Sequence, residues 1–304
     1  MSLFLMLAMQ AAPPVIDPVL MPERREESET ATPAPAEADS PVVRRGRRLL
    51  SCIQTADTDP QAAIAEGARW LLDGGGIEAE LCVGVGQEAA GSFAEARAAY
   101  DRAAGLAATA GDPREQGIRV SIGRMALAEG DAEAARAIFN AALGSSALNE
   151  ETQAQVHAER ARALVALDEG DAARADLLEA QRLAPNDVGI WLLSATLARR
   201  QGALEAAGDL IDRALELDRE DPAVLLEAGN IAIGLNAYDV ARQAWQEASA
   251  AGPDTPAGQA AARNLQRLAE FTAEEGTVDV DLPEGLIEDD EVMDAEEGGD
   301  APTP

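Results

Sequence analysis

The chain contains no lysine, and all 24 of its basic residues are arginine. Its 55 acidic residues give a formal net charge of −31 at pH 7. Nucleic-acid binding needs a clustered positive surface that neutralises phosphates, so the composition argues against nucleic acid as a partner. The one basic cluster is Arg44-Arg45-Gly46-Arg47-Arg48. We interpret it either as a solvated helix start or as a contact to an anionic surface or tail.

Residues that usually carry catalysis or hold metals are scarce. The single histidine, His157, falls in a predicted helix, where a lone histidine is typical of the helix surface. The run Gly74-Gly75-Gly76 follows a predicted helix rather than a strand and has no lysine after it, so it is not a phosphate-binding loop. Spacings typical of metal ligands are missing as well. We therefore predict no catalytic residue, no cofactor and no metal site, and a protein that is not an enzyme.

Long apolar runs are also missing, so the sequence predicts no membrane-spanning helix. The short run from Leu3 to Met9 lacks the basic start and the length of a secretory signal. Residues 1–12 are therefore either a truncated export signal or an apolar terminus without structure. The first alternative predicts a periplasmic or exported protein, and the second leaves a cytoplasmic one.

Aromatic residues make up only 3% of the chain, whereas alanine is abundant, and this composition favours close-packed helices over a sheet. The spacing of small and large residues repeats every 34 residues, in two consecutive copies that start at Val188 and Pro222. Positions 4, 8, 15, 20, 24 and 27 hold Trp191, Ala195, Gly202, Ala207, Ile211 and Ala214 in one copy, and Leu225, Gly229, Asn236, Ala241, Trp245 and Ala248 in the next. Small residues at positions 8, 20 and 27 let two helices approach closely, and large residues at 4 and 24 fill the space beside them.

Units that start at Ile77 and Gln116 carry the same pattern, whereas the unit from Ala154 matches it less well because Asp168 stands where a turn glycine belongs. The pattern resembles the tetratricopeptide repeat. That resemblance implies an all-α, right-handed α-solenoid of helix-turn-helix repeats. Because one hairpin cannot bury its apolar face alone, such a stack needs about three or more repeats and an atypical unit at each end.

The chain divides accordingly into six segments. These are the candidate signal segment 1–12, a disordered Pro/Glu/Ala linker 13–43, a divergent helical cap 44–76, about five repeats over 77–255, a capping helix 256–272 and an acidic disordered tail 273–304.

The resemblance further implies a protein-interaction scaffold or adaptor that holds a protein or peptide segment in a concave groove. In the family the groove is lined at positions 2, 5, 9, 12 and 13 of the first helix of each repeat. Here these positions include Leu81, Val85, Val120, Arg124, Leu127, Leu192, Thr196, Arg199, Arg200, Leu226, Asn230 and Ile233. The alternatives are a structural envelope-associated solenoid without a peptide ligand and an accessory subunit of an enzyme.

Three arginines among these positions, Arg124, Arg199 and Arg200, suggest that the groove prefers acidic ligands despite the acidic protein. The chain's own tail, with 13 acidic residues and no basic one after position 272, is a candidate for intramolecular docking there. In the alternative interpretation these arginines pair with glutamates of neighbouring helices, and the tail only keeps the protein soluble.

The two cysteines fall in first helices that are neighbours in a stack of repeats. Cys52 lies in the cap and Cys82 in the following unit. A disulfide between them would indicate an oxidising compartment. The alternative is two small buried thiols. A redox enzyme is not indicated, since the pair is no Cys-x-x-Cys motif.

Overall fold

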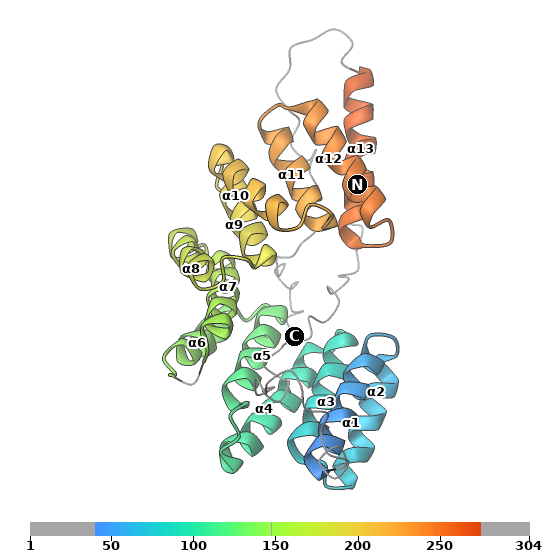
Figure 1. Ribbon diagram of the computed structural model, residues 1–304, viewed down its shortest axis with the longest axis vertical. Helices are drawn as coiled ribbons and strands as arrows, with labels where there is room; N and C mark the ends of the chain where they lie inside the picture. Colours follow the sequence, from blue (N-terminus) through green and yellow to red (C-terminus); the bar gives the residue numbers. More distant parts are fainter. Residues whose placement is uncertain (1–39, 147, 275–304) are drawn as a thin grey trace, which may run out of the picture. The chain divides into compact units, whose positions relative to one another are not determined.

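The computed structural model describes residues 40–146 and 148–274. In these ranges the chain forms thirteen α-helices and no strand (Figure 1). The helices are α1 Pro41–Ala56, α2 Pro60–Leu72, α3 Gly76–Ala89, α4 Phe93–Ala110, α5 Glu115–Ala128, α6 Ala132–Leu143, α7 Glu150–Ala166, α8 Gly170–Leu183, α9 Val188–Arg200, α10 Leu204–Leu217, α11 Pro222–Gly234, α12 Tyr238–Ala251 and α13 Pro256–Glu274. The predicted all-α fold class is confirmed. The signal segment, the linker up to residue 39 and the tail from residue 275 lie outside the described residues.

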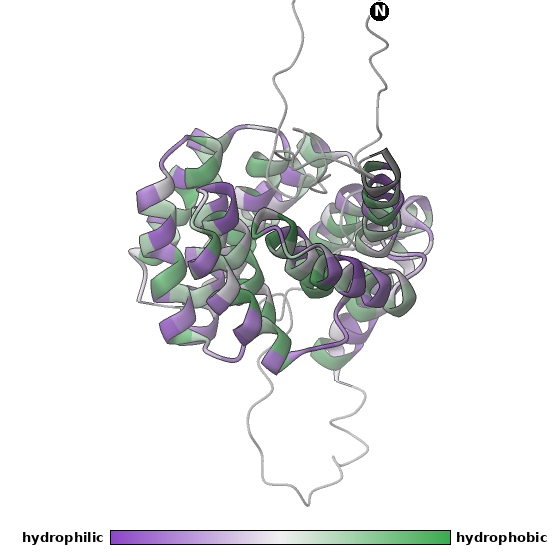
Figure 2. Cartoon of the chain, turned by 90° about the horizontal axis from the view of Figure 1, so that it is seen from above, coloured by the Kyte–Doolittle hydropathy of each residue, from purple (hydrophilic) through white to green (hydrophobic). Residues whose placement is uncertain are grey.

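The described helices divide into two compact units, α1 to α7 and α8 to α13, at the turn after Leu167. Within each unit, helices that follow one another in the chain pack together, as α3 packs on α4 and α11 on α12. First helices of successive hairpins also touch, as α1 touches α3 and α9 touches α11. Individual helices carry hydrophobic residues on one side and hydrophilic residues on another (Figure 2). This arrangement is that of stacked helix-turn-helix repeats, in which each hairpin contacts its neighbours.

The turn between the two helices of a repeat has the same backbone conformation in all five units from Ile77 onward. Position 15 takes a positive φ in each of them: 72° at Gly91, 81° at Gly130, 59° at Asp168, 74° at Gly202 and 59° at Asn236. Glycine tolerates this left-handed conformation, and asparagine and aspartate tolerate it better than other residues do. The unit with the weakest sequence match therefore makes the same turn without the glycine.

Three helix starts of the second unit repeat at the 34-residue spacing. Asp187 and Asp221 accept hydrogen bonds through their side chains from the backbone N–H three residues later, at 3.2 and 3.3 Å. Thr255 does the same at the start of α13, at 3.1 Å. Each side chain satisfies one of the backbone donors that the first turn of a helix leaves open. The repeat spacing thus extends into α13.

Helix α13 closes the stack because its outer side is polar. In α11, Leu225 and Ala232 are both 5% exposed where they meet α12. Gln259 and Gln266 stand 34 residues later in α13 and are exposed. A further helix would find no apolar surface to pack on at these two positions, which is what a terminal cap requires.

The amino-terminal helix begins earlier than the sequence predicts. Helix α1 starts at Pro41, three residues inside the segment interpreted as linker. Ser40 caps it by accepting a hydrogen bond from the Val43 N–H at 3.2 Å, and Pro41 occupies a first-turn position that tolerates proline. The Pro-rich composition conceals this helix start, since the capping pair is also typical of a linker.

In three of the repeats, glycine at position 8 permits the close approach of the two helices. A Cβ atom added to Gly229 would lie 2.3 Å from Nε1 of Trp245, and one added to Gly84 would lie 2.6 Å from the ring of Tyr100. Both aromatic side chains are fully buried. The ring at position 24 thus packs directly on the backbone of the first helix, as the pairing of small and large positions predicts.

Candidate functional site

The predicted groove residues lie on the first helices α3, α5, α9 and α11, but they do not form one open surface. Six of them are at most 7% exposed and belong to the packed interior: Leu81, Val85, Val120, Leu226, Asn230 and Ile233. The side chains at these positions therefore contribute to the cohesion of each unit. A partner could reach them in this structure only if neighbouring groups moved.

A buried ion pair occupies two positions of α9 and α11. Arg199 donates from Nε to Glu227 at 2.8 Å, and the two side chains are 9% and 7% exposed. Asn230 in turn donates to the other oxygen of Glu227 at 3.3 Å. Its own oxygen accepts from Nε1 of Trp245 and from the amide of Asn264, both at 3.2 Å. In this structure a carboxylate of the neighbouring helix therefore holds the guanidinium of Arg199, which the repeat numbering places in the groove.

Five of the predicted residues keep part of their surface exposed: Arg124, Leu127, Leu192, Thr196 and Arg200. Arg124 donates to the hydroxyl of Ser121, one turn earlier in α5, at 3.3 Å. Thr196 donates to the Leu192 carbonyl at 3.0 Å, so its hydroxyl is engaged with its own helix. These residues mix aliphatic and cationic groups on α5 in the first unit and on α9 in the second.

The unit from Ala154 contributes two further positions of this kind, which its poor match to the repeat pattern conceals. Arg162 and Val165 occupy positions 9 and 12 of that unit, on α7, and both are partly exposed. They correspond to Arg124 and Leu127 of α5. Position 15 of this unit makes the ordinary turn, so its residues follow the same numbering as in the other units. A count from Ala154 therefore identifies both positions.

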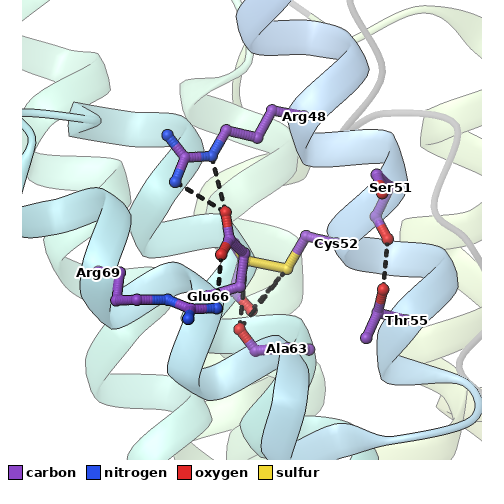
Figure 3. Close-up of polar contacts among 8 residues, drawn as sticks. Arg48, Ser51, Cys52, Thr55, Ala63, Glu66 and Arg69 are labelled. Atoms are coloured by element: carbon purple, nitrogen blue, oxygen red, sulfur yellow. Dashed lines mark hydrogen bonds and ion pairs between the residues drawn. A yellow bond between two sulfur atoms is a disulfide. The ribbon is translucent and has the colours of Figure 1, made fainter.

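A disulfide joins the cap to the first repeat. Cys52 of α1 and Cys82 of α3 are bonded, with their Cα atoms 5.8 Å apart. The two residues are 2% and 0% exposed, and the Cys82 sulfur lies 3.4 Å from the carbonyl oxygen of Ala63 in α2. One covalent link thus lies where three helices meet (Figure 3). The structure has the bonded form of this pair rather than two separate thiols.

Two arginines converge on Glu66 beside the disulfide (Figure 3). Arg48 of α1 donates from Nε at 2.8 Å, and Arg69 donates from Nη2 at 2.8 Å. The hydrogen bond from Arg48 lowers the pKa of the Glu66 carboxyl from its ordinary value. The Arg48 guanidinium also lies 4.5 Å from the ring centroid of Trp70. Part of the basic cluster is therefore a structural clamp between α1 and α2.

A second clamp joins α3 to the turn before α5. Arg114 donates to Glu78 at 2.9 Å and to Asp112 at 2.7 Å, and all three side chains are less than one-fifth exposed. The Arg114 guanidinium holds the pKa of Asp112 below its usual value, chiefly through their hydrogen bond. The Arg114–Glu78 pair, like Arg48–Glu66 and Arg199–Glu227, thus holds separate segments of the fold together.

No arrangement typical of metal chemistry occurs within residues 40–146 and 148–274. No group of three or more histidine, cysteine or acidic side chains in these ranges could hold a metal ion. His157 lies on α7, half-buried. Among the helices that the structure describes, none has the length and apolarity needed to cross a membrane.

Comparison with known proteins agrees with this architecture. The sequence profile of the tetratricopeptide repeat matches residues 86–150 and 159–222. The search of curated proteins found no match to the chain. Among solved structures, yeast Tom70 superimposes with a TM-score of 0.60 at 16% identity, over 77% of this chain and 48% of Tom70.

Two bacterial structures are similar over nearly their whole length. PilF of Pseudomonas aeruginosa gives a TM-score of 0.53 at 17% identity and covers 76% of this chain and 99% of its own. BtubC from P. vanneervenii gives 0.52 at 18% identity, over 79% and 98%. At such identities the likeness concerns the fold alone. Together with the turn at position 15 and the stacked hairpins, the profile matches show that the chain carries tetratricopeptide repeats within residues 86–150 and 159–222.

Proposed function

We propose that the protein is a non-catalytic interaction scaffold that binds a protein or peptide segment on the exposed faces of its first helices. The observation that carries the proposal is the pairing of partly exposed aliphatic and cationic side chains there, Leu127 with Arg124 and Leu192 with Arg200. Aliphatic groups supply contact area, and guanidinium groups orient polar ligands through directed hydrogen bonds.

The repeat fold supports this function because it supplies a preformed surface. First helices are held by neighbouring helices of the same unit, as α9 is by α10 and α11, so binding costs little conformational entropy in the scaffold. Interfaces of this kind draw most of their affinity from a few central side chains. Leu127 and Leu192 are the candidates for that role, since they are apolar and not fully buried.

A matched set of variants tests the proposal. Leu127→Asp and Leu192→Asp place a charge on the first helices, whereas Leu178→Asp places one on α8, where Leu178 is 61% exposed. A specific partner isolated from the native host with the parent chain should lose at least tenfold in affinity for the first two variants and little for the third. Equal binding by all four proteins, each shown to be folded by circular dichroism, would contradict the proposal.

We further propose that the protein works in an oxidising compartment, either periplasmic or outside the cell. The buried disulfide supports this location, because cytosolic reductants keep most thiols reduced. Docking of the acidic tail on the first helices remains part of the proposal as a competitor of external ligands. Salt-dependent release of the tail, followed by proteolysis of residues 275–304, would measure it.

A further inference from the structure

Two arginines of the first unit occupy equivalent positions on helices that pack against each other. Arg124 is at position 9 of the unit from Gln116, and Arg162 is at position 9 of the unit from Ala154. Helices α5 and α7, which carry them, are in contact. Packed helices have axes about 8–10 Å apart, so two long guanidinium side chains at the same level can reach one ligand group between them.

The orientation of Arg162 follows from its neighbour on the same helix. Arg160 donates to Asn140 of α6 at 2.7 Å, so that side of α7 faces α6. Arg162 lies two residues later, about 200° further around the helix axis. Its side chain therefore leaves α7 on the side away from α6, and 35% of its surface is exposed.

The hydrogen bonding of Arg162 is incomplete among the described residues. Its Nη1 lies 4.0 Å from a Glu159 oxygen, at the outer limit of an ion pair, and its Nε is buried with no hydrogen-bond partner in that part of the chain. Arg199 of the second unit contrasts with it, since Glu227 holds that guanidinium at 2.8 Å. Because the ion pair of Arg162 with Glu159 is this long and 35% of its side chain is exposed, the Arg162 guanidinium can donate to a carboxylate ligand from its exposed side.

Aliphatic side chains accompany both arginines. Leu127 and Val165 lie three residues after Arg124 and Arg162, about one helical turn along each helix, and both are partly exposed. The four side chains combine two guanidinium groups with two aliphatic groups about 5 Å further along the same helices. Such a surface fits a segment that presents a carboxylate and, one turn away, an aliphatic side chain.

We propose that Arg124 and Arg162 form an anion subsite that selects a partner segment carrying an acidic side chain next to an aliphatic one. This inference rests on the proposed function and specifies its ligand chemistry. The net charge of −31 disfavours acidic ligands at long range, but screening limits that effect to about 8–10 Å at physiological salt. Specificity then comes from the hydrogen bonds made at contact.

Peptide titrations on the full-length chain test the subsite. The probes are a 12-residue acetylated helical peptide with glutamate and leucine three or four positions apart, and the same peptide with glutamine in place of glutamate. We expect the parent chain to bind the glutamate peptide more tightly than the glutamine peptide. Arg162→Gln should lower the affinity for the glutamate peptide about tenfold and leave the affinity for the glutamine peptide unchanged. Arg162→Lys should restore part of the difference. Arg136→Gln, on α6 and paired with Glu133, is the matched control and should change neither affinity.

The outcomes separate this inference from the general function. If Leu127→Ser weakens the binding of both peptides and Arg162→Gln weakens the binding of neither, the surface binds partners and the anion subsite is refuted. The same titrations are repeated on a full-length chain in which the acidic residues from 288 to 300 are changed to their amides, which removes the competing tail. If this variant binds the glutamate peptide and the parent chain does not, the result supports the subsite and identifies the tail as its occupant in the parent. A lack of preference for the glutamate peptide by both chains overturns the inference.

Discussion

Replacement of Trp245 by alanine tests the packing on which the repeat interpretation depends. The indole is fully buried in the second unit, and its Nε1 donates to the Leu226 carbonyl and to Asn230, both at 3.2 Å. Loss of a buried tryptophan side chain removes about 150–250 Å² of contact, equivalent to about 4–6 kcal/mol at 25 cal/mol per Å². Measured losses for large core aromatics run from about 3 to 5 kcal/mol.

The surroundings place Trp245→Ala toward the upper part of that range. The ring lies against the backbone at Gly229, so no side chain there can move in to fill the cavity. Asn230 keeps one donor, from Asn264, and loses only one hydrogen bond. We therefore expect a loss of about 4–5 kcal/mol in the free energy of unfolding of the unit that contains α8 to α13.

Urea titration followed by circular dichroism measures this change, and hydrogen exchange localises it. With a slope of about 2 kcal/mol per molar urea, the transition of the second unit should move about 2 M lower. Exchange should accelerate most in α11, α12 and α13, because contacts in repeat proteins are between nearest neighbours. Trp245→Phe keeps a ring and removes the donor, so it should cost only about 1–2 kcal/mol. An unchanged transition, or a loss spread evenly over α1 to α7, would refute the assigned register.

Three other predictions concern the cap, the turns and the pH dependence. Mass spectrometry of unreduced native protein should recover Cys52 and Cys82 in one linked peptide pair, and two free thiols would remove the argument for an oxidising compartment. Because the disulfide spans 30 residues, Cys82→Ser should destabilise the cap by about 3–4 kcal/mol. Asp168→Gly should leave the free energy of unfolding unchanged or raise it by up to about 1 kcal/mol, because glycine adopts the positive φ without strain. A thermal melt measures this, and a clear loss of stability would show that the aspartate side chain stabilises the turn. Arg48 lowers the folded-state pKa of Glu66. The ionised Glu66 carboxylate therefore stabilises the fold above its unfolded-state pKa of about 4.3, and this stabilisation is lost as the pH falls through the lower folded-state pKa. The stability gap between the parent and Glu66→Gln should therefore narrow on acidification, and a constant gap from pH 7 to 3 would contradict the assigned cause.

The sequence alone determined the repeat architecture of this protein. Alternation of small and large residues at a fixed spacing specifies which helix faces can approach each other, and position 15 marks each turn. These are local or periodic properties, so a count along the chain reveals them. Helix boundaries were less accessible: the Ser40–Pro41 start of α1 is hidden because the same residues are typical of a linker.

Tertiary structure alone decided which polar residues stay available to a partner. Arg124 and Arg199 both stand at predicted groove positions, 9 and 12 of their units, and the structure places Arg199 in a buried ion pair with Glu227 of the neighbouring helix, which no count along the chain predicts. The choice of partner depends on the relative rotation and separation of two helices to within an ångström, and hydrogen bonds lose their strength beyond that tolerance. Periodicity places a side chain on a face of its helix, but only the packing of the next helix determines whether that face is buried, paired or free to bind.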